Sequence, residues 1–122
     1  MDPDQFVALV SEVLDSLPEQ FAAALENVEV VVEDWPDVRT RRLAGVRSRY
    51  DLLGFYHGIP LTERTSGYNL VAPDKISIYQ KSIEAQCETD EEVAELTTTV
   101  VLHEVAHFFG IGDERLRELG AY

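Results

Sequence analysis

Residues 89–113 read TDEEVAELTTTVVLHEVAHFFGIGD, and this stretch decides the fold. It opens on Thr89, which a glutamate follows three positions later in the capping-box pattern of helix starts, and it runs to Phe109 without glycine or proline. We therefore expect the longest helix of the chain here, ending at Gly110. Residues 97–101 are β-branched and favour a strand by propensity alone, so this helix depends on its surroundings.

The residues on the faces of this helix predict how it packs against the rest of the protein. At about 100° per residue, one side changes from polar to apolar along the helix, through Glu91, Glu92, Glu95, Thr98, Thr99, Leu102, Ala106 and Phe109. The solvent-exposed face of the helix therefore becomes narrower toward its C-terminal end. We expect protein to cover the later turns on most sides.

The later turns carry His103-Glu104-Val105-Ala106-His107, the HExxH pattern. Positions i and i+4 of an α-helix differ by about 40° in direction and about 6 Å in height, so both imidazoles can reach one metal ion. Glu104 then points to the side of the pair, where it can hold a water on the metal without binding the metal itself. A buried helix can also carry two histidines that are hydrogen-bonded to carbonyls, so the pentapeptide alone leaves both interpretations open.

A third ligand is needed, because catalytic zinc generally takes three protein ligands and keeps its fourth position for water. Gly110 can turn the chain, after which Asp113, ten positions beyond His103, returns toward the metal. The full string, HExxHxxGxxD, favours zinc bound by the two histidines and Asp113. An aspartate that begins a short helix is also a common N-cap, which leaves Glu114 and Glu118 as alternative third ligands.

The remaining chain alternates short helices and strands. Asp2 precedes Pro3 and has Gln5 three positions on, a second capping-box pattern, and Pro18 interrupts the helix that follows. We expect helices over 3–17, 19–25 and 113–119, strands over 28–32, 52–56 and 76–79, and a loop over 60–74.

The length of 122 residues is usual for one domain, and no stretch has the composition of a linker, so we expect a single domain over 1–122. The N-terminus has no basic region before an apolar stretch, and no apolar run is long enough to cross a bilayer. The single cysteine, Cys87, cannot form an internal disulfide, which agrees with a reducing compartment. We expect a cytoplasmic protein without membrane contact.

The net charge of −13 repels a nucleic-acid polyanion at long range, which disfavours a nuclease. The positive charge is uneven, because half of the ten Lys and Arg lie in one span without an acid: Arg39, Arg41, Arg42, Arg47 and Arg49. This span is either a solvated surface or a site for an anion or a partner.

Four other residues are weaker candidates. His57 follows a predicted strand and is either a surface residue or a substrate contact. Tyr56, Tyr68 and Tyr79 can each donate a hydrogen bond to an oxyanion, although packing in the core is the usual use of tyrosine. The sequence does not choose among them.

Three stretches resemble small bacterial zincin-like domains, a family of zinc metallopeptidases with largely unassigned substrates: LLGFYHGIPLTER at 52–64, PDKISIY at 73–79, and residues 100–120. The resemblance implies an α+β, zincin-like fold, in which a small mixed sheet packs on the active-site helix and one edge strand lines the cleft. It also implies that His103 and His107 bind Zn²⁺ and that Glu104 is the general base.

The string is also similar to the metzincin motif with Asp113 in place of the third histidine. The only methionine is Met1, so the methionine turn of metzincins has no counterpart, and only nine residues follow Asp113. We therefore expect a shallow, one-sided site. A ribosome-maturation hydrolase family uses the related pattern HGxxHxxGxxH, from which this chain differs at Glu104 and Asp113.

These observations favour a zinc-dependent metallopeptidase that hydrolyses peptides or unfolded proteins, with Glu104 activating a water on the metal. Two alternatives stay open. One is a metal-stabilised protein-interaction domain with little hydrolysis. The other, disfavoured by the net charge, is a metal-dependent RNA hydrolase that acts through the arginine-rich span.

Overall fold

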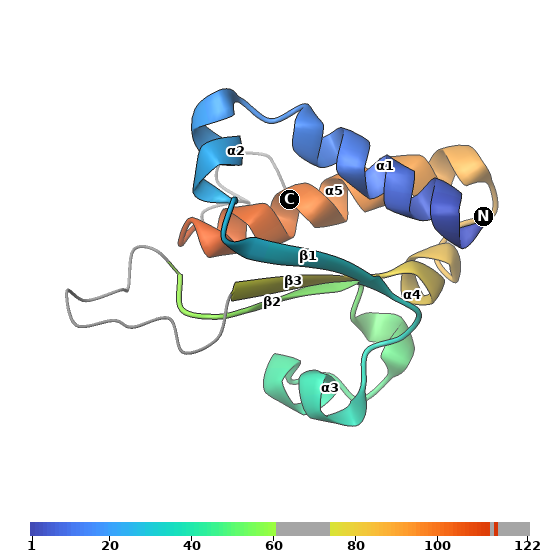
Figure 1. The fold of residues 1–122 in the computed structure, drawn as a ribbon. Helices are drawn as coiled ribbons and strands as arrows, with labels where there is room; N and C mark the ends of the chain where they lie inside the picture. The colour runs from blue at the N-terminus through green and yellow to red at the C-terminus, as the bar shows by residue number, and fades with distance from the viewer. Residues whose placement is uncertain (61–73, 113, 115–122) are drawn as a thin grey trace.

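The computed structural model describes residues 1–60, 74–112 and 114 of the chain (Figure 1). Its elements are, in chain order, α1 (Pro3–Asp15), α2 (Glu19–Ala24), β1 (Val28–Glu33), α3 (Val38–Ala44), the 3-10 helix η1 (Arg49–Asp51), β2 (Gly54–His57), β3 (Asp74–Tyr79), α4 (Gln80–Glu84) and α5 (Asp90–Phe108). The small sheet and the separate helices confirm the α+β class.

The three strands form one mixed sheet in the order β1-β3-β2. β1 runs parallel to β3, with Val30 opposite Ile76, and β2 runs antiparallel to β3, with Tyr56 opposite the same residue. β3 is therefore the central strand. β2 forms an edge of the sheet in the part of the chain that the structure describes.

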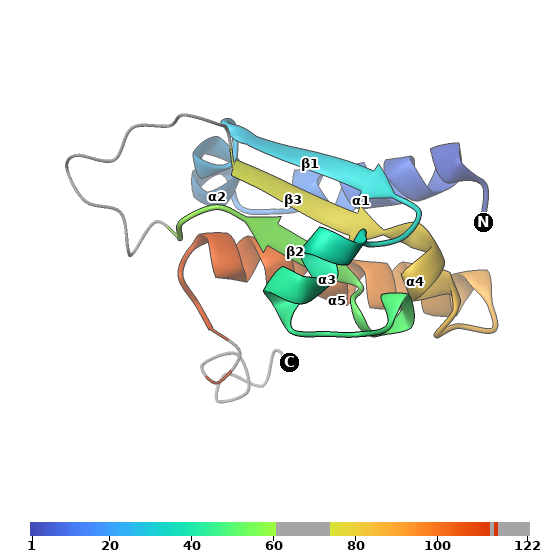
Figure 2. The ribbon, with the colours of Figure 1, turned by 90° about the horizontal axis from the view of Figure 1, so that it is seen from below.

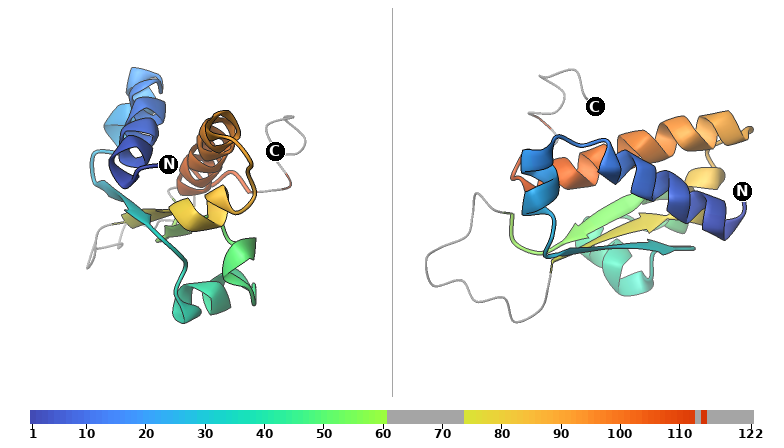
Figure 3. Two further views of the ribbon diagram at one scale, coloured as in Figure 1. Left: turned by 90° about the vertical axis from the view of Figure 1, so that its right-hand side faces the viewer. Right: turned by 45° about the horizontal axis from the view of Figure 1, so that its top comes forward.

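Helices cover both faces of this sheet. α1 and α5 lie side by side on one face, while α3 and η1 lie on the other (Figures 1 and 3). Seen from the side of α3, the strands run between these two layers (Figure 2). The main core lies between the sheet and the α1–α5 layer, and its fully buried side chains include Phe6, Ile76, Ile78, Ile83 and Val101.

α5 begins as the sequence predicts. The Thr89 hydroxyl oxygen accepts a hydrogen bond from the backbone N–H of Glu92 at 3.1 Å, and the Glu92 carboxylate accepts one from the N–H of Glu88 at 2.8 Å. The first bond satisfies an N–H group of the first turn that has no partner within the helix, and the second joins that turn to the residue before the N-cap. The predicted capping box of α1 is not formed, because the Asp2 side chain accepts no such bond.

The end of α5 is also at its predicted place. Gly110 has φ of 82°, and its N–H donates to the carbonyl of His107 at 2.9 Å. The N–H of Ile111 donates to the carbonyl of Ala106 at 2.9 Å. This pair of bonds is the Schellman motif, which needs the left-handed conformation that glycine adopts at little cost.

The predicted burial along α5 is confirmed with one exception. None of the residues from 103 to 109 is exposed, whereas Leu102 is 43% exposed. Threonines 97 to 99 are helical despite their propensity, because Thr97 is buried in the packed face of the helix. Tertiary packing therefore decides the conformation of this segment.

The other predicted elements differ mainly at their ends. β2 begins two residues later than predicted and extends to His57, and β3 begins two residues earlier, at Asp74. The helices α3 and α4 and the short η1 were not predicted. Residues 61–73 of the predicted loop, and nearly all of the helix predicted over 113–119, lie outside the described residues. No helix in the described part has the length and apolar character needed to span a membrane.

Replacing Thr89 with alanine should lower the free energy of unfolding by about 0.5–2 kcal/mol, because the N-cap acceptor of α5 is lost. Urea unfolding followed by circular dichroism measures the change. Thr99→Ala is the matched control, since Thr99 lies within α5 and its hydroxyl only donates to the carbonyl of Glu95. An equal loss in both variants would contradict a capping role for Thr89.

Candidate metal centre

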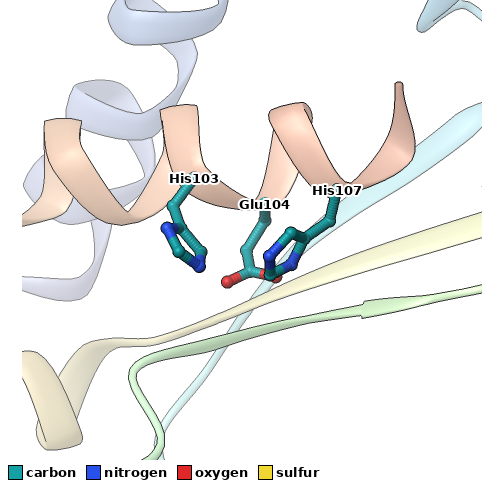
Figure 4. A group of neighbouring side chains, drawn as sticks. All are labelled: His103, Glu104 and His107. Atoms are coloured by element: carbon teal, nitrogen blue, oxygen red, sulfur yellow. The ribbon is translucent and has the colours of Figure 1, made fainter. Parts of the chain in front are cut away.

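α5 directs three side chains capable of metal binding toward the sheet: His103, Glu104 and His107 (Figure 4). One ligand atom from each residue can be chosen so that all lie within 4.8 Å of one another. The two imidazole rings are 4.4 Å apart between centroids. The helical i, i+4 spacing therefore brings both histidines to one place, as the sequence predicts.

Glu104 lies beside His107, because side chains three positions apart are neighbours on a helix. Its Oε1 atom is 3.1 Å from Nδ1 of His107, and the residue is only 6% exposed. We expected Glu104 to point to the side of the histidine pair, but its carboxylate instead turns toward the imidazoles (Figure 4). The carboxylate oxygens therefore lie next to the imidazole nitrogens.

Gly54, at the start of β2, allows α5 to approach the sheet at Glu104. A Cβ atom at this position would lie 2.8 Å from Cγ1 of Val100, 3.1 Å from Cγ of Glu104 and 3.2 Å from the carbonyl oxygen of Ser77. The first distance is shorter than real Cβ contacts, so any larger residue at this position would force the Val100 side chain or the helix to shift. Sequence reasoning placed Gly54 in a strand but missed this role, although a glycine inside a strand is a known sign of close approach.

A cavity of about 510 Å³ opens in front of these side chains. α5 forms one wall, and β2, an edge strand in the described part of the chain, forms part of another, which is the arrangement that the resemblance implies. The lining residues on the α5 side are Leu96, Thr99, Val100, His103, Glu104 and His107. Those on the opposite side are Ala44, Val46 and residues 51–55. Most of the lining is apolar, and the histidines and Glu104 form a polar end; Asp51 and Thr99 are the other polar residues of the lining.

The chemistry of these donors fits a zinc ion. Imidazole nitrogen and carboxylate oxygen are both common zinc ligands, and two histidines from one helix are a frequent part of catalytic sites. The structure describes only one of the three candidates for the third ligand. Asp113 and Glu118 lie outside the described residues, and Glu114 is exposed. The assignment of Asp113 and the shallow shape of the site therefore stay predictions.

His57, the third histidine, lies apart from this group. Its Nε2 is 3.2 Å from the hydroxyl oxygen of Ser77, on the face of the sheet away from α5. Burial lowers the pKa of the His57 imidazole, which favours its neutral form. This residue is therefore a hydrogen-bonded part of the sheet rather than a neighbour of the candidate centre.

Neither of the two described tyrosine candidates lines the cavity. The Tyr56 hydroxyl donates to the carbonyl of Ile59 or the carboxylate of Asp74, at 3.0 and 3.1 Å. Tyr79 is 1% exposed, and burial raises the pKa of its hydroxyl. Both are packed side chains, and Tyr68 lies outside the described residues.

Comparison with known proteins gives one finding about the family. A family model described as "Zincin-like metallopeptidase" matches residues 25–121, which include β1, the whole sheet and α5. A search of curated proteins found no match.

Gly54→Ala should destabilise the protein by about 1–3 kcal/mol, the usual cost of adding a methyl group to a well-packed contact. Denaturant unfolding measures it. Gly112→Ala is the control, because a Cβ atom there meets no atom within 4 Å. If the two variants are equally stable, the contact between β2 and α5 is looser than these distances indicate.

Proposed function

The chain belongs to the zincin-like metallopeptidase family, and from this premise we propose that it is a zinc-dependent peptidase with Glu104 as its general base. The observation that carries the proposal is the convergence of His103, Glu104 and His107 within 4.8 Å at the polar end of a cavity. Two core histidines bonded to carbonyls do not require a buried carboxylate beside them. A metal-dependent hydrolase does require such a carboxylate, because a general base must take the proton from the attacking water.

In this proposal His103 and His107 each give one ring nitrogen to the zinc ion, and Asp113 supplies the third ligand. When Nδ1 of His107 carries the proton, it donates to Glu104 at 3.1 Å and leaves Nε2 as the lone-pair donor. That hydrogen bond also fixes the orientation of the ring. A bound zinc ion supplies Lewis acidity, which lowers the pKa of a water molecule and polarises the carbonyl of the peptide bond.

We assign the proton transfers to Glu104, whose carboxylate lies beside the two histidines. Its carboxylate accepts a proton from the attacking water as the oxygen–carbon bond forms, and it returns that proton to the leaving nitrogen as the carbon–nitrogen bond breaks. Low exposure of the carboxylate keeps bulk water from competing for the proton. The space left by the missing side chain of Gly54 leaves room for the Glu104 side chain against β2.

The substrate we propose is a peptide or an unfolded protein segment. Gly54 and Phe55 of β2, which is an edge strand among the described residues, line the cavity, and we propose that the substrate lies beside this edge as an extended chain. A folded protein surface offers such a chain only where it is locally unfolded. Short or unfolded peptides are therefore expected to be better substrates than folded proteins.

Purified wild-type protein should contain about one zinc per chain, and His103→Ala and His107→Ala should lose it, because the remaining ligands hold the ion too weakly. Asp113→Ala should weaken zinc binding while the fold is retained. Elemental analysis and zinc titration measure both effects. His57→Ala is the control for removal of an imidazole and should keep its zinc, since His57 lies outside the group.

Two results would contradict this assignment. One is wild-type protein that contains no zinc and takes none up on titration. The other is full zinc affinity in Asp113→Ala together with loss in Glu114→Ala or Glu118→Ala, which would move the third ligand to one of those glutamates.

Glu104→Gln should keep the zinc content and the helicity of the protein, but its peptide cleavage should fall by about 10²–10⁴-fold, the usual contribution of an acid–base group. The amide is nearly isosteric and can still hydrogen-bond to His107. The measurement is cleavage of a peptide library by mass spectrometry at matched zinc content. Equal cleavage by wild type and variant would indicate a contaminating protease or another base. No cleavage by zinc-loaded wild type would favour a metal-stabilised interaction domain.

A further inference from the structure

Five arginines gather on the face of the sheet opposite α1 and α5. They belong to α3, to the turn after it and to η1, which lie together below the strands in Figure 1. Four of them are exposed and Arg41 is half-buried; the set is Arg39, Arg41, Arg42, Arg47 and Arg49. We call residues 38–50 the arginine segment. It contains no acidic residue, although the whole chain carries a net charge of −13.

Among the described residues, the arginine segment differs from the two lysines in its lack of ion pairs. Lys75 lies 4.0 Å from the Glu33 carboxylate and Lys81 lies 3.7 Å from that of Asp34. Among the described residues, none of the five arginines lies within 4.0 Å of a carboxylate. Asp37, at one end of the segment, instead accepts a hydrogen bond from the Thr40 N–H at 2.7 Å.

Internal contacts hold part of the arginine segment in place. The Arg49 guanidinium lies 4.1 Å from the centroid of the Trp35 ring and 5.4 Å from that of Tyr50. Arg41 donates a hydrogen bond from Nη1 to the carbonyl oxygen of Arg47 at 2.6 Å. A charged surface that is already ordered loses less conformational entropy when a partner binds.

The arginine segment also borders the candidate metal centre. Ala44 and Val46 line the same cavity as His103, Glu104 and His107. Arg42 precedes Ala44 by two positions, and Arg47 directly follows Val46. Both arginines therefore belong to the segment that forms this wall, and a chain that occupies the cavity and continues past the wall runs over that segment.

From these observations, and resting on the peptidase function proposed above, we propose that the arginine segment binds acidic side chains of the peptide substrate beside the cleavage site. Guanidinium groups pair with carboxylates in a directed, two-bond geometry. The negative charge over the rest of the protein repels an acidic peptide from other positions. Acidic residues of the substrate thus determine which peptides bind and in which direction they lie in the cavity.

A peptide fits this surface better than a nucleic acid does. The arginine segment exposes large apolar side chains beside its charges, with Val38 51%, Leu43 64% and Tyr50 45% exposed. The neighbouring cavity is lined mainly by apolar residues. A peptide can offer apolar and acidic side chains together, whereas a nucleic acid offers a continuous polyanion that the net charge of −13 opposes.

The test measures binding separately from cleavage. Zinc-loaded Glu104→Gln protein is titrated with two fluorescein-labelled peptides of equal length. Both share an apolar segment, and one carries a run of glutamates where the other carries glutamines. We expect the acidic peptide to bind about three- to tenfold more tightly, the combined effect of two exposed ion pairs. Adding Arg42→Gln and Arg47→Gln should abolish this preference. Adding Lys75→Gln and Lys81→Gln changes the charge equally and should preserve it.

Equal affinity for the two peptides, or a preference that survives loss of Arg42 and Arg47, would overturn the proposal. So would a poly-uridine RNA of equal charge that displaces the acidic peptide and binds more tightly, since the surface would then serve nucleic acid. If the arginine variant does not fold, raising NaCl from about 50 to about 500 mM must remove the preference in the protein with native arginines.

Wild-type cleavage assays separate this proposal from the proposed function. Arginine-dependent binding without any cleavage would support the acidic-peptide surface and contradict the peptidase. Cleavage of both peptides with equal kcat/KM would support the peptidase and contradict the role of the arginine segment.

Discussion

The candidate site depends on one close contact, between the backbone of β2 at Gly54 and the side chains of Val100 and Glu104 on α5. The absence of a side chain at this point lets the helix lie directly against the edge strand. As a result, a carboxylate that sequence alone would place on the flank of a helix is buried beside two imidazoles. The other contacts of the fold, from α1 on the same face of the sheet to the caps of α5, hold the helix at that distance.

The sequence predicted the features that depend on local chemistry. The start of α5 at Thr89 and its end at Gly110 follow from side-chain and backbone hydrogen bonds within a few residues. Convergence of His103 and His107 follows from helical geometry alone. The sheet was predicted from alternating and β-branched runs, with errors of about two residues at the ends of β2 and β3.

The features missed by sequence analysis depend on residues far apart in the chain. The burial of Glu104 depends on the approach of α5 to Gly54, far earlier in the chain, which no local pattern encodes. α3 was missed because its seven residues contain four polar or charged side chains and little apolar periodicity. Its stability comes from the Asp37 cap and from its place against the sheet, and the proximity of this segment to the cavity is visible only in three dimensions.

All three side chains of the described centre come from less than two turns of a single helix. A site assembled from distant strands is lost when the chain unfolds, so a ligand that binds it adds its full binding free energy to folding stability. Two histidines at i and i+4 remain neighbours in any transient helix of the unfolded chain and retain some affinity for metal there. A metal ion held by this group would therefore stabilise the fold by less than its affinity for the native protein implies.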